Sequence, residues 1–134
     1  MGLLGEAVAD AESWLQACPD RIDALRMKAR LFGKLGQTDI QCATLAQVCT
    51  LDPSHDNESI VGLAYLKAGR FAEAVQHYTR AVQLEPKSTK YRFKLAYALQ
   101  KMGQFDRARA MLQTVLKEDP NHVDARDFLG KLAG

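Results

Sequence analysis

The sequence predicts an all-α fold, a right-handed α-solenoid of antiparallel helix pairs, and its regular punctuation is the main reason. Four prolines recur at intervals of 34, 33 and 34 residues, at Pro19, Pro53, Pro86 and Pro120. Three glycines follow the same period, at Gly36, Gly69 and Gly103. Between these marks, apolar residues fall at the i, i+3, i+4 and i+7 positions of a helix with one buried face. Each period therefore predicts a helix, a glycine turn, a second helix and a proline turn. Neighbouring pairs must stack, because two short helices cannot bury their own apolar faces.

We expect eight helices, at about residues 3–17, 22–34, 38–50, 56–68, 72–84, 89–102, 105–117 and 122–132. The first two carry apolar stripes, at Leu4, Ala7, Val8, Ala11 and Leu15, and at Leu25, Ala29 and Phe32. The third carries Cys42, Leu45, Val48 and Cys49. Its start at Thr38, followed by Gln41, resembles a capping box.

The later helices have stronger stripes. The fourth and sixth contain the apolar runs 60–66 and 93–99. The fifth carries Phe71, Ala74, Val75, Tyr78, Ala81 and Val82. The seventh carries Phe105, Ala108, Met111, Leu112, Val115 and Leu116, and the eighth carries Ala125, Phe128, Leu129 and Leu132.

Composition narrows the classes of function. The chain of 134 residues is 47% hydrophobic and 25% charged, which is typical of one soluble domain. A formal net charge of +2 is too small for a dedicated nucleic-acid binder, so we expect no nucleic-acid partner. No apolar run approaches the roughly 18 residues of a membrane span, and the start lacks the features of a signal peptide. The three cysteines, Cys18, Cys42 and Cys49, do not form a disulfide framework, and they favour a reducing, cytoplasmic location.

The period and its residues resemble the tetratricopeptide repeat. The best match comprises Val61, Gly62, Tyr65, Gly69, Phe71, Ala74, Tyr78, Ala81 and Pro86. The resemblance implies a half repeat at 1–20, full repeats at 21–54, 55–87 and 88–121, and a half repeat at 122–134. Because both ends fall within a repeat, we expect a fragment of a longer protein. The resemblance also implies a scaffold that binds another protein or peptide in a concave groove.

Residues that could perform chemistry are scattered along the sequence. The histidines lie in different repeats, with His55 and His122 near proline turns and His77 beside a buried stripe. We interpret all three as surface residues, with no metal-ligand spacing to the cysteines. Cys42 and Cys49 lie on a core stripe and are expected to be small buried hydrophobes. We therefore predict no catalytic residue, no metal and no cofactor, and we do not expect an enzyme.

The first helices of the three full repeats line the concave surface in this family, and eighteen positions should face it. Seven of these are basic and two are acidic, a net of +5, whereas the whole chain is +2. A positively charged groove favours acidic partners. We predict that a peptide, acidic or C-terminal, contacts Arg26, Arg30, Leu63, Lys67, Lys90, Phe93, Lys94, Tyr97 and Lys101. Lys34, Lys67 and Lys101 have an alternative role, because each ends a helix where a cation complements the helix dipole.

Some family members grip a partner's terminal carboxylate with lysine, arginine and asparagine residues. Arg26 with Arg30, and Lys90 with Lys94, occupy the outer charged pairs of that clamp. Arg30 and Ile60 stand where asparagines are expected, so a looser acidic-peptide groove competes with a true clamp. Two other functions remain open: an assembly module that self-associates through its incomplete terminal repeats, and a substrate-docking appendage of an enzyme outside this chain.

Overall fold

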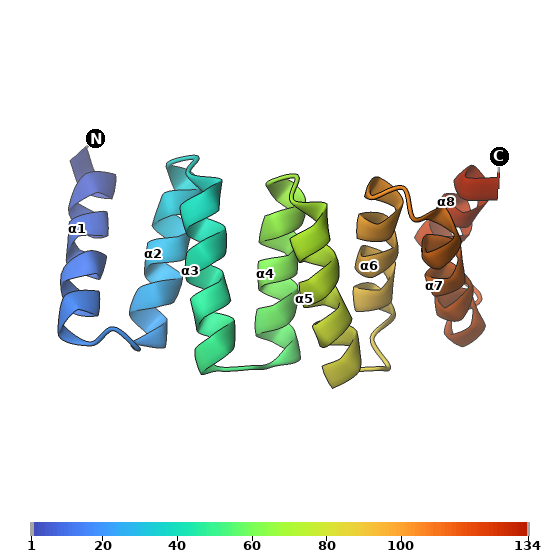
Figure 1. The fold of residues 1–134 in the computed structure, drawn as a ribbon, viewed down its shortest axis with the longest axis horizontal. Coiled ribbons are helices and arrows are strands. Elements are labelled where there is room, and N and C mark those ends of the chain that lie inside the picture. Colours follow the sequence, from blue (N-terminus) through green and yellow to red (C-terminus); the bar gives the residue numbers. More distant parts are fainter. Residues whose placement is uncertain (1, 134) are drawn as a thin grey trace.

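The computed structural model describes residues 2–133, which form eight helices joined by short turns. The helices are α1 (Gly2–Ala17), α2 (Ile22–Lys34), α3 (Thr38–Leu51), α4 (His55–Lys67), α5 (Phe71–Leu84), α6 (Thr89–Lys101), α7 (Phe105–Glu118) and α8 (Val123–Ala133). They stand side by side in one row, with the two ends of the chain at opposite ends of the row (Figure 1). Each helix packs chiefly against the helices before and after it in sequence. The predicted α-solenoid is therefore confirmed.

Glycine ends the first helix of each full pair. Gly36, Gly69 and Gly103 adopt φ values of 76°, 77° and 78°, the left-handed conformation that glycine takes without steric cost. At the first turn, the Gln37 N–H donates to the Phe32 carbonyl at 2.9 Å and the Gly36 N–H to the Gly33 carbonyl at 3.1 Å. These two bonds form a Schellman motif, which satisfies carbonyls that a helix end would otherwise leave free. The other two glycine turns repeat the pattern.

Two helices begin with a serine cap, but the capping box predicted at Thr38 was wrong. Ser54 Oγ accepts a hydrogen bond from the Asn57 N–H at 3.2 Å, and Ser88 Oγ accepts from the Tyr91 N–H at 3.3 Å. At α3 the residue before the helix is Gln37, whose side chain makes no capping bond, and Thr38 is already helical. The glycine turn sets this boundary, because the Schellman motif carries Gln37 directly into the next helix.

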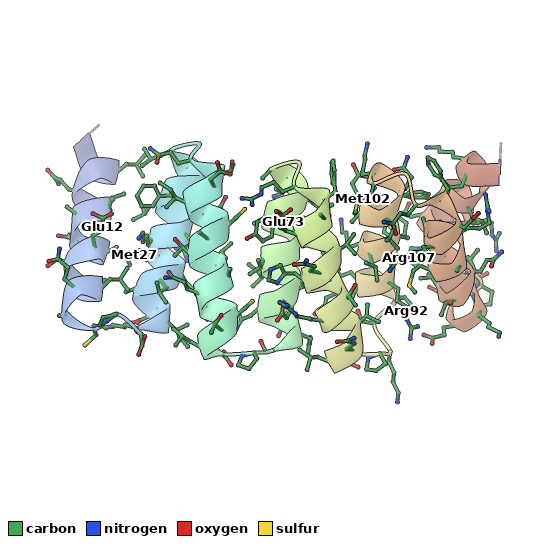
Figure 2. All side chains as sticks on the ribbon, viewed as in Figure 1. Glu12, Met27, Glu73, Arg92, Met102 and Arg107 are labelled. Carbon is green, nitrogen blue, oxygen red and sulfur yellow. The ribbon has the colours of Figure 1, made fainter. Side chains whose placement is uncertain are left out.

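Small residues allow the helices to approach closely. Ala74, Ala81, Ala96 and Ala108 are fully buried between neighbouring helices, alongside Leu99 and Leu112. At the contact between α4 and α5, a methyl group on Gly62 would lie 2.8 Å from the ring of Tyr78, so only glycine fits there. Side chains occupy the spaces between adjacent ribbons along the whole row (Figure 2). The core is thus a chain of interfaces, as expected for stacked repeats.

The buried cysteines were predicted correctly. Cys42 and Cys49 lie in the core on α3, and Cys18 is exposed after α1. Among the described residues, no helix combines the length and the apolar character needed to cross a lipid bilayer.

Candidate functional site

A concave cavity of about 940 Å³ opens between the first helices of successive pairs. We call it the α4–α8 cavity. It is lined by Leu63, Leu66 and Lys67 of α4, Phe93, Lys94, Tyr97 and Gln100 of α6, Phe105 of α7, and Asp124, Asp127, Phe128, Lys131 and Leu132 of α8. Its volume is in the range of ligand-binding clefts, which combine apolar walls with a few charged groups.

Aromatic contacts shape the floor of the α4–α8 cavity. Phe128 packs edge-on against Phe93, with ring centroids 5.9 Å apart, and against Tyr97 at 6.3 Å. The ammonium group of Lys101 lies 5.4 Å from the Tyr97 ring centroid, a cation–π contact. Leu63 and Tyr97 each remain 37% exposed despite being large and apolar. These two side chains therefore offer apolar surface that a bound partner can cover.

A smaller cavity of about 270 Å³ lies among α2, α3 and α4, and we call it the α2–α4 cavity. Arg26 and Arg30 line it together with Asn57 and Ile60. Arg26 is not free, because its guanidinium donates to Asn57 Oδ1 at 2.9 Å and lies 4.0 Å from a carboxylate oxygen of Asp52. Buried Asn57 is itself held by Asp52. Part of the Arg26 charge is therefore used to join α2 to α4.

The predicted groove residues fall into separate places. Leu63, Lys67, Phe93, Lys94 and Tyr97 meet in the α4–α8 cavity. Arg26 and Arg30 lie in the α2–α4 cavity. Lys90 is an exposed residue of α6 that lines neither cavity, and Lys101 contacts the larger one only through Tyr97.

Sequence reasoning missed the contribution of α8. The 34-residue period was a sufficient signal: moving 34 positions on from Lys90, Phe93, Lys94 and Tyr97 gives Asp124, Asp127, Phe128 and Lys131, all of which line the α4–α8 cavity. This helix adds two carboxylates to a lining that also holds lysines of α4, α6 and α8. The larger cavity therefore has mixed charge, and not the uniform positive charge expected from the full repeats alone.

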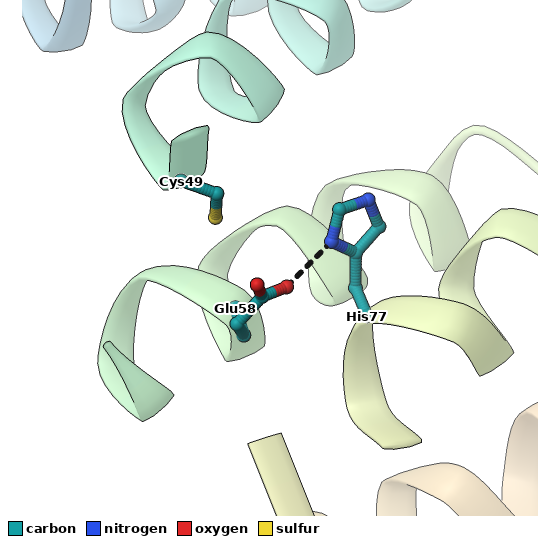
Figure 3. Close-up of side chains that lie close together, drawn as sticks. All are labelled: Cys49, Glu58 and His77. Atoms are coloured by element: carbon teal, nitrogen blue, oxygen red, sulfur yellow. Dashed lines mark hydrogen bonds and ion pairs between the residues drawn. The ribbon is translucent and has the colours of Figure 1, made fainter. Parts of the chain in front are cut away.

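A second polar site was also missed, and the prediction that His77 is a surface residue was wrong. His77 of α5 is 8% exposed, and its Nδ1 lies 2.7 Å from a carboxylate oxygen of Glu58 on α4, which is 5% exposed (Figure 3). The ring of His77 also stacks on Tyr65 at 5.4 Å. Cys49 of α3 brings its sulfur to the same place, and the ligand-type atoms of the three residues all lie within 4.8 Å of one another. The irregular sequence spacing of these residues did not predict this cluster.

The other two histidines are less free than predicted. Nδ1 of His55 lies 2.8 Å from the hydroxyl of Tyr91, which links α4 to α6. Nδ1 of His122 accepts a hydrogen bond from the Ala125 N–H at 3.0 Å, so it caps α8, and its ring stacks on Phe93. Both are only partly exposed.

Two buried acids make the fold sensitive to alkaline pH. Burial, reinforced by the nearby charge of Glu58, raises the pKa of the Cys49 thiol from 9.0 to about 12. Burial likewise raises the pKa of Tyr78 from 10.0 to about 12. Between about pH 9 and 12 the folded chain keeps protons that the unfolded chain loses, so we expect stability to fall as the pH rises through this range.

Urea unfolding at increasing pH, followed by circular dichroism, measures this dependence. Tyr78→Phe removes one of the two groups and is expected to flatten the decline. A urea midpoint that stayed constant or rose between about pH 9 and 11 would contradict the assignment.

The raised pKa of Cys49 also bears on chemistry. A catalytic cysteine needs a lowered pKa so that the thiolate is present at neutral pH. Cys49 has the opposite shift. Its proximity to His77 therefore does not make it an activated nucleophile.

The fold and the two cavities define a class of protein: an all-helical solenoid whose first helices form a concave surface. The profile described as "Tetratricopeptide repeat" matches residues 65–132, just over half of the chain. The chain belongs to the tetratricopeptide repeat family.

Individual proteins agree with this assignment. The chain is 34% identical over 100 residues to Superkiller complex protein 3 of Homo sapiens, a match that covers 73% of the chain and 6% of that protein's length. The crystal structure of YrrB, described as a TPR protein with an unusual peptide-binding site, superposes with a TM-score of 0.80 at 21% identity, covering 96% of this chain and 67% of YrrB. The first TPR of Spaghetti (RPAP3), bound to the HSP90 peptide SRMEEVD, superposes with a TM-score of 0.68 at 23% identity. The match covers 84% of this chain and 93% of the RPAP3 chain.

Proposed function

We propose that this chain is a protein-interaction scaffold that binds a partner peptide in the α4–α8 cavity. The observation that carries the proposal is the cavity itself: about 940 Å³, concave, with an aromatic floor and lysines on its walls. Leu63 and Tyr97, which line it, each keep more than a third of their surface exposed. A few buried aromatic anchors and charge-assisted hydrogen bonds supply most of the energy in peptide recognition.

We infer that the peptide is acidic or ends in a free carboxylate. Lys67 and Lys94 line the cavity beside its apolar floor, so a carboxylate could pair with them while a neighbouring apolar side chain covers Leu63 and Tyr97. Arg30 lines the α2–α4 cavity and is a further exposed positive group. Asp124 and Asp127 disfavour a carboxylate at the α8 side, so the acidic end should lie toward α4 and α6.

Fluorescence anisotropy with short labelled peptides tests this function. The HSP90 peptide SRMEEVD, which the structurally similar RPAP3 domain binds, is a suitable probe. It would be used with a free and with an amidated C-terminus. We expect amidation of the peptide, or Lys67→Ala with Lys94→Ala in the protein, to weaken binding at least about tenfold, since each removes charge-assisted hydrogen bonds at the lining of the cavity.

A charge-matched control removes two lysines elsewhere. Lys87 and Lys117 are exposed and line neither cavity, so Lys87→Ala with Lys117→Ala should leave the affinity within about twofold. Both double variants are expected to keep wild-type helicity and unfolding midpoints. Equal loss of affinity in the two variants would show that the lysines act only through general electrostatic attraction, and not through contacts in the cavity. No binding of either peptide form by the wild type would reject the acidic-peptide proposal.

Self-association is the second candidate, and one observation favours it. Trp14 on α1 is 43% exposed at the end of the row, although the guanidinium of Arg21 lies over its ring at 5.5 Å. Phe128 and Leu129, at the other end, are partly buried against the core and so offer little apolar surface for stacking. Sedimentation over a wide range of protein concentration separates the two functions: a mass that rises with concentration in wild type, and not in Trp14→Ala, would favour assembly.

A further inference from the structure

We propose that Cys49, Glu58 and His77 form a binding site for a divalent transition-metal ion, with Zn²⁺ the best match. The three side chains come from α3, α4 and α5, and all three are buried. Their ligand-type atoms lie within 4.8 Å of one another (Figure 3). This site is separate from the α4–α8 cavity and does not depend on the peptide-binding proposal.

The chemistry of the three donors selects the metal. Thiolate, imidazole and carboxylate together suit Zn²⁺ and its analogue Co²⁺, whereas Ca²⁺ and Mg²⁺ prefer oxygen donors alone. Three protein ligands would leave one position of a tetrahedral ion for water or another donor. Zn²⁺ would therefore be bound at an incomplete site, unlike a structural site closed by four protein ligands.

The geometry is close to what binding needs. Metal–ligand bonds of about 2.0–2.3 Å in a tetrahedral site place the ligand atoms roughly 3.3–3.7 Å apart. The Glu58 oxygen and His77 Nδ1 are 2.7 Å apart and would separate slightly, and the remaining gaps, at most 4.8 Å, would close by about an ångström. Rotamer adjustments of this size do not require the three helices to move apart or to rotate.

Charge balance also favours a divalent ion at this buried place. When Zn²⁺ replaces the thiol proton of Cys49, the charges of the thiolate, the carboxylate, a neutral imidazole and the divalent ion sum to zero. Binding therefore avoids burying an uncompensated charge, which is costly in a protein interior. We expect the proton of the Cys49 thiol to be released when the ion binds.

A bound ion would cross-link two adjacent helix pairs. The helix α3 closes one pair, while α4 and α5 form the next, so one ion would join two stacked units. An ion that binds only the folded chain raises its free energy of unfolding, by an amount that grows with the logarithm of the ion concentration once this exceeds Kd. We therefore expect Zn²⁺ to raise the unfolding midpoint, and a chelator to return it to the metal-free value.

Cobalt spectroscopy tests the site directly. Because burial raises the pKa of the Cys49 thiol to about 12, a near-ultraviolet thiolate-to-cobalt absorption at neutral pH reports deprotonation driven by the metal. The chain treated with chelator and then titrated with Co²⁺ should show this absorption at one ion per chain, and Zn²⁺ should remove it. The chain carrying Cys18→Ser and Cys42→Ser, in which Cys49 is the remaining cysteine, should behave in the same way.

Removing a ligand provides the opposing test. Cys49→Ser should abolish the thiolate absorption, and His77→Gln should weaken Zn²⁺ binding at least about 100-fold, with folding of each variant checked by circular dichroism. Absence of thiolate absorption from the folded Cys18→Ser, Cys42→Ser chain would overturn the proposal, whatever the folding of the other variants. Equal Zn²⁺ affinity of folded Cys49→Ser and wild type would also overturn it.

Discussion

Ala74→Arg is expected to unfold the repeats around α5. Ala74 is fully buried where α5 meets its neighbours, so an arginine there has no route to solvent and no space between the helices. Overpacking and an unpaired buried charge act together, and we expect a loss of at least about 4 kcal/mol. Since domains of this size are typically stable by about 5–15 kcal/mol, much of the helical circular dichroism signal should disappear at room temperature or in low urea.

Ala72→Arg is the matched control for this prediction. Ala72 lies two residues earlier on the same helix and is exposed, so the same substitution meets water there. Its free energy of unfolding, measured with urea, should change by no more than about 0.5 kcal/mol. Comparable damage from the two variants, or greater damage from Ala72→Arg, would contradict the assignment of the buried face of α5.

The buried pair of Glu58 and His77 carries the second large effect. In His77→Leu the Glu58 carboxylate keeps its burial but loses its only hydrogen-bonded partner among the described residues, and we expect a loss of about 3 kcal/mol. Glu58→Met should cost less, about 1–2 kcal/mol, because an imidazole left alone can remain neutral. Urea unfolding of metal-free protein measures both values.

The double variant separates the pair interaction from simple packing. Because two apolar side chains of similar volume can replace a buried polar pair at little cost, the Glu58→Met, His77→Leu chain should be more stable than His77→Leu alone. The coupling between the two sites is expected to exceed about 1 kcal/mol. Additive losses would show that the 2.7 Å contact contributes nothing to stability. Removing metal with a chelator keeps this measurement independent of the Zn²⁺ proposal.

Local signals predicted most of the fold. A glycine in the left-handed conformation and a serine before a helix form hydrogen bonds with residues only a few positions away. The turn at Gly69 and the starts of α4 and α6 could therefore be predicted from neighbouring residues in the sequence. The period extends this local information along the chain. The expected helix limits of 56–68 and 72–84 differ from His55–Lys67 and Phe71–Leu84 by one residue at most.

The candidate peptide site was predictable only in part. The period placed Leu63, Phe93 and Tyr97 on one face, and the structure brings them together. The period alone could not show that Arg26 donates to Asn57, because that bond depends on how closely α2 and α4 approach. It also could not show how closely α8 approaches α6, which brings Phe128 against Phe93 and Tyr97.

By itself, the sequence determined the eight helices, their order and the apolar stripe of each one, since these follow from local conformation and from apolar periodicity. Only the tertiary structure decided which polar groups share a buried space. Glu58 and His77 are 19 residues apart, on different helices, and neither position has a sequence pattern that identifies a partner. Their meeting with Cys49 depends on the packing of three helices, where a shift of an ångström decides whether donor atoms can act together.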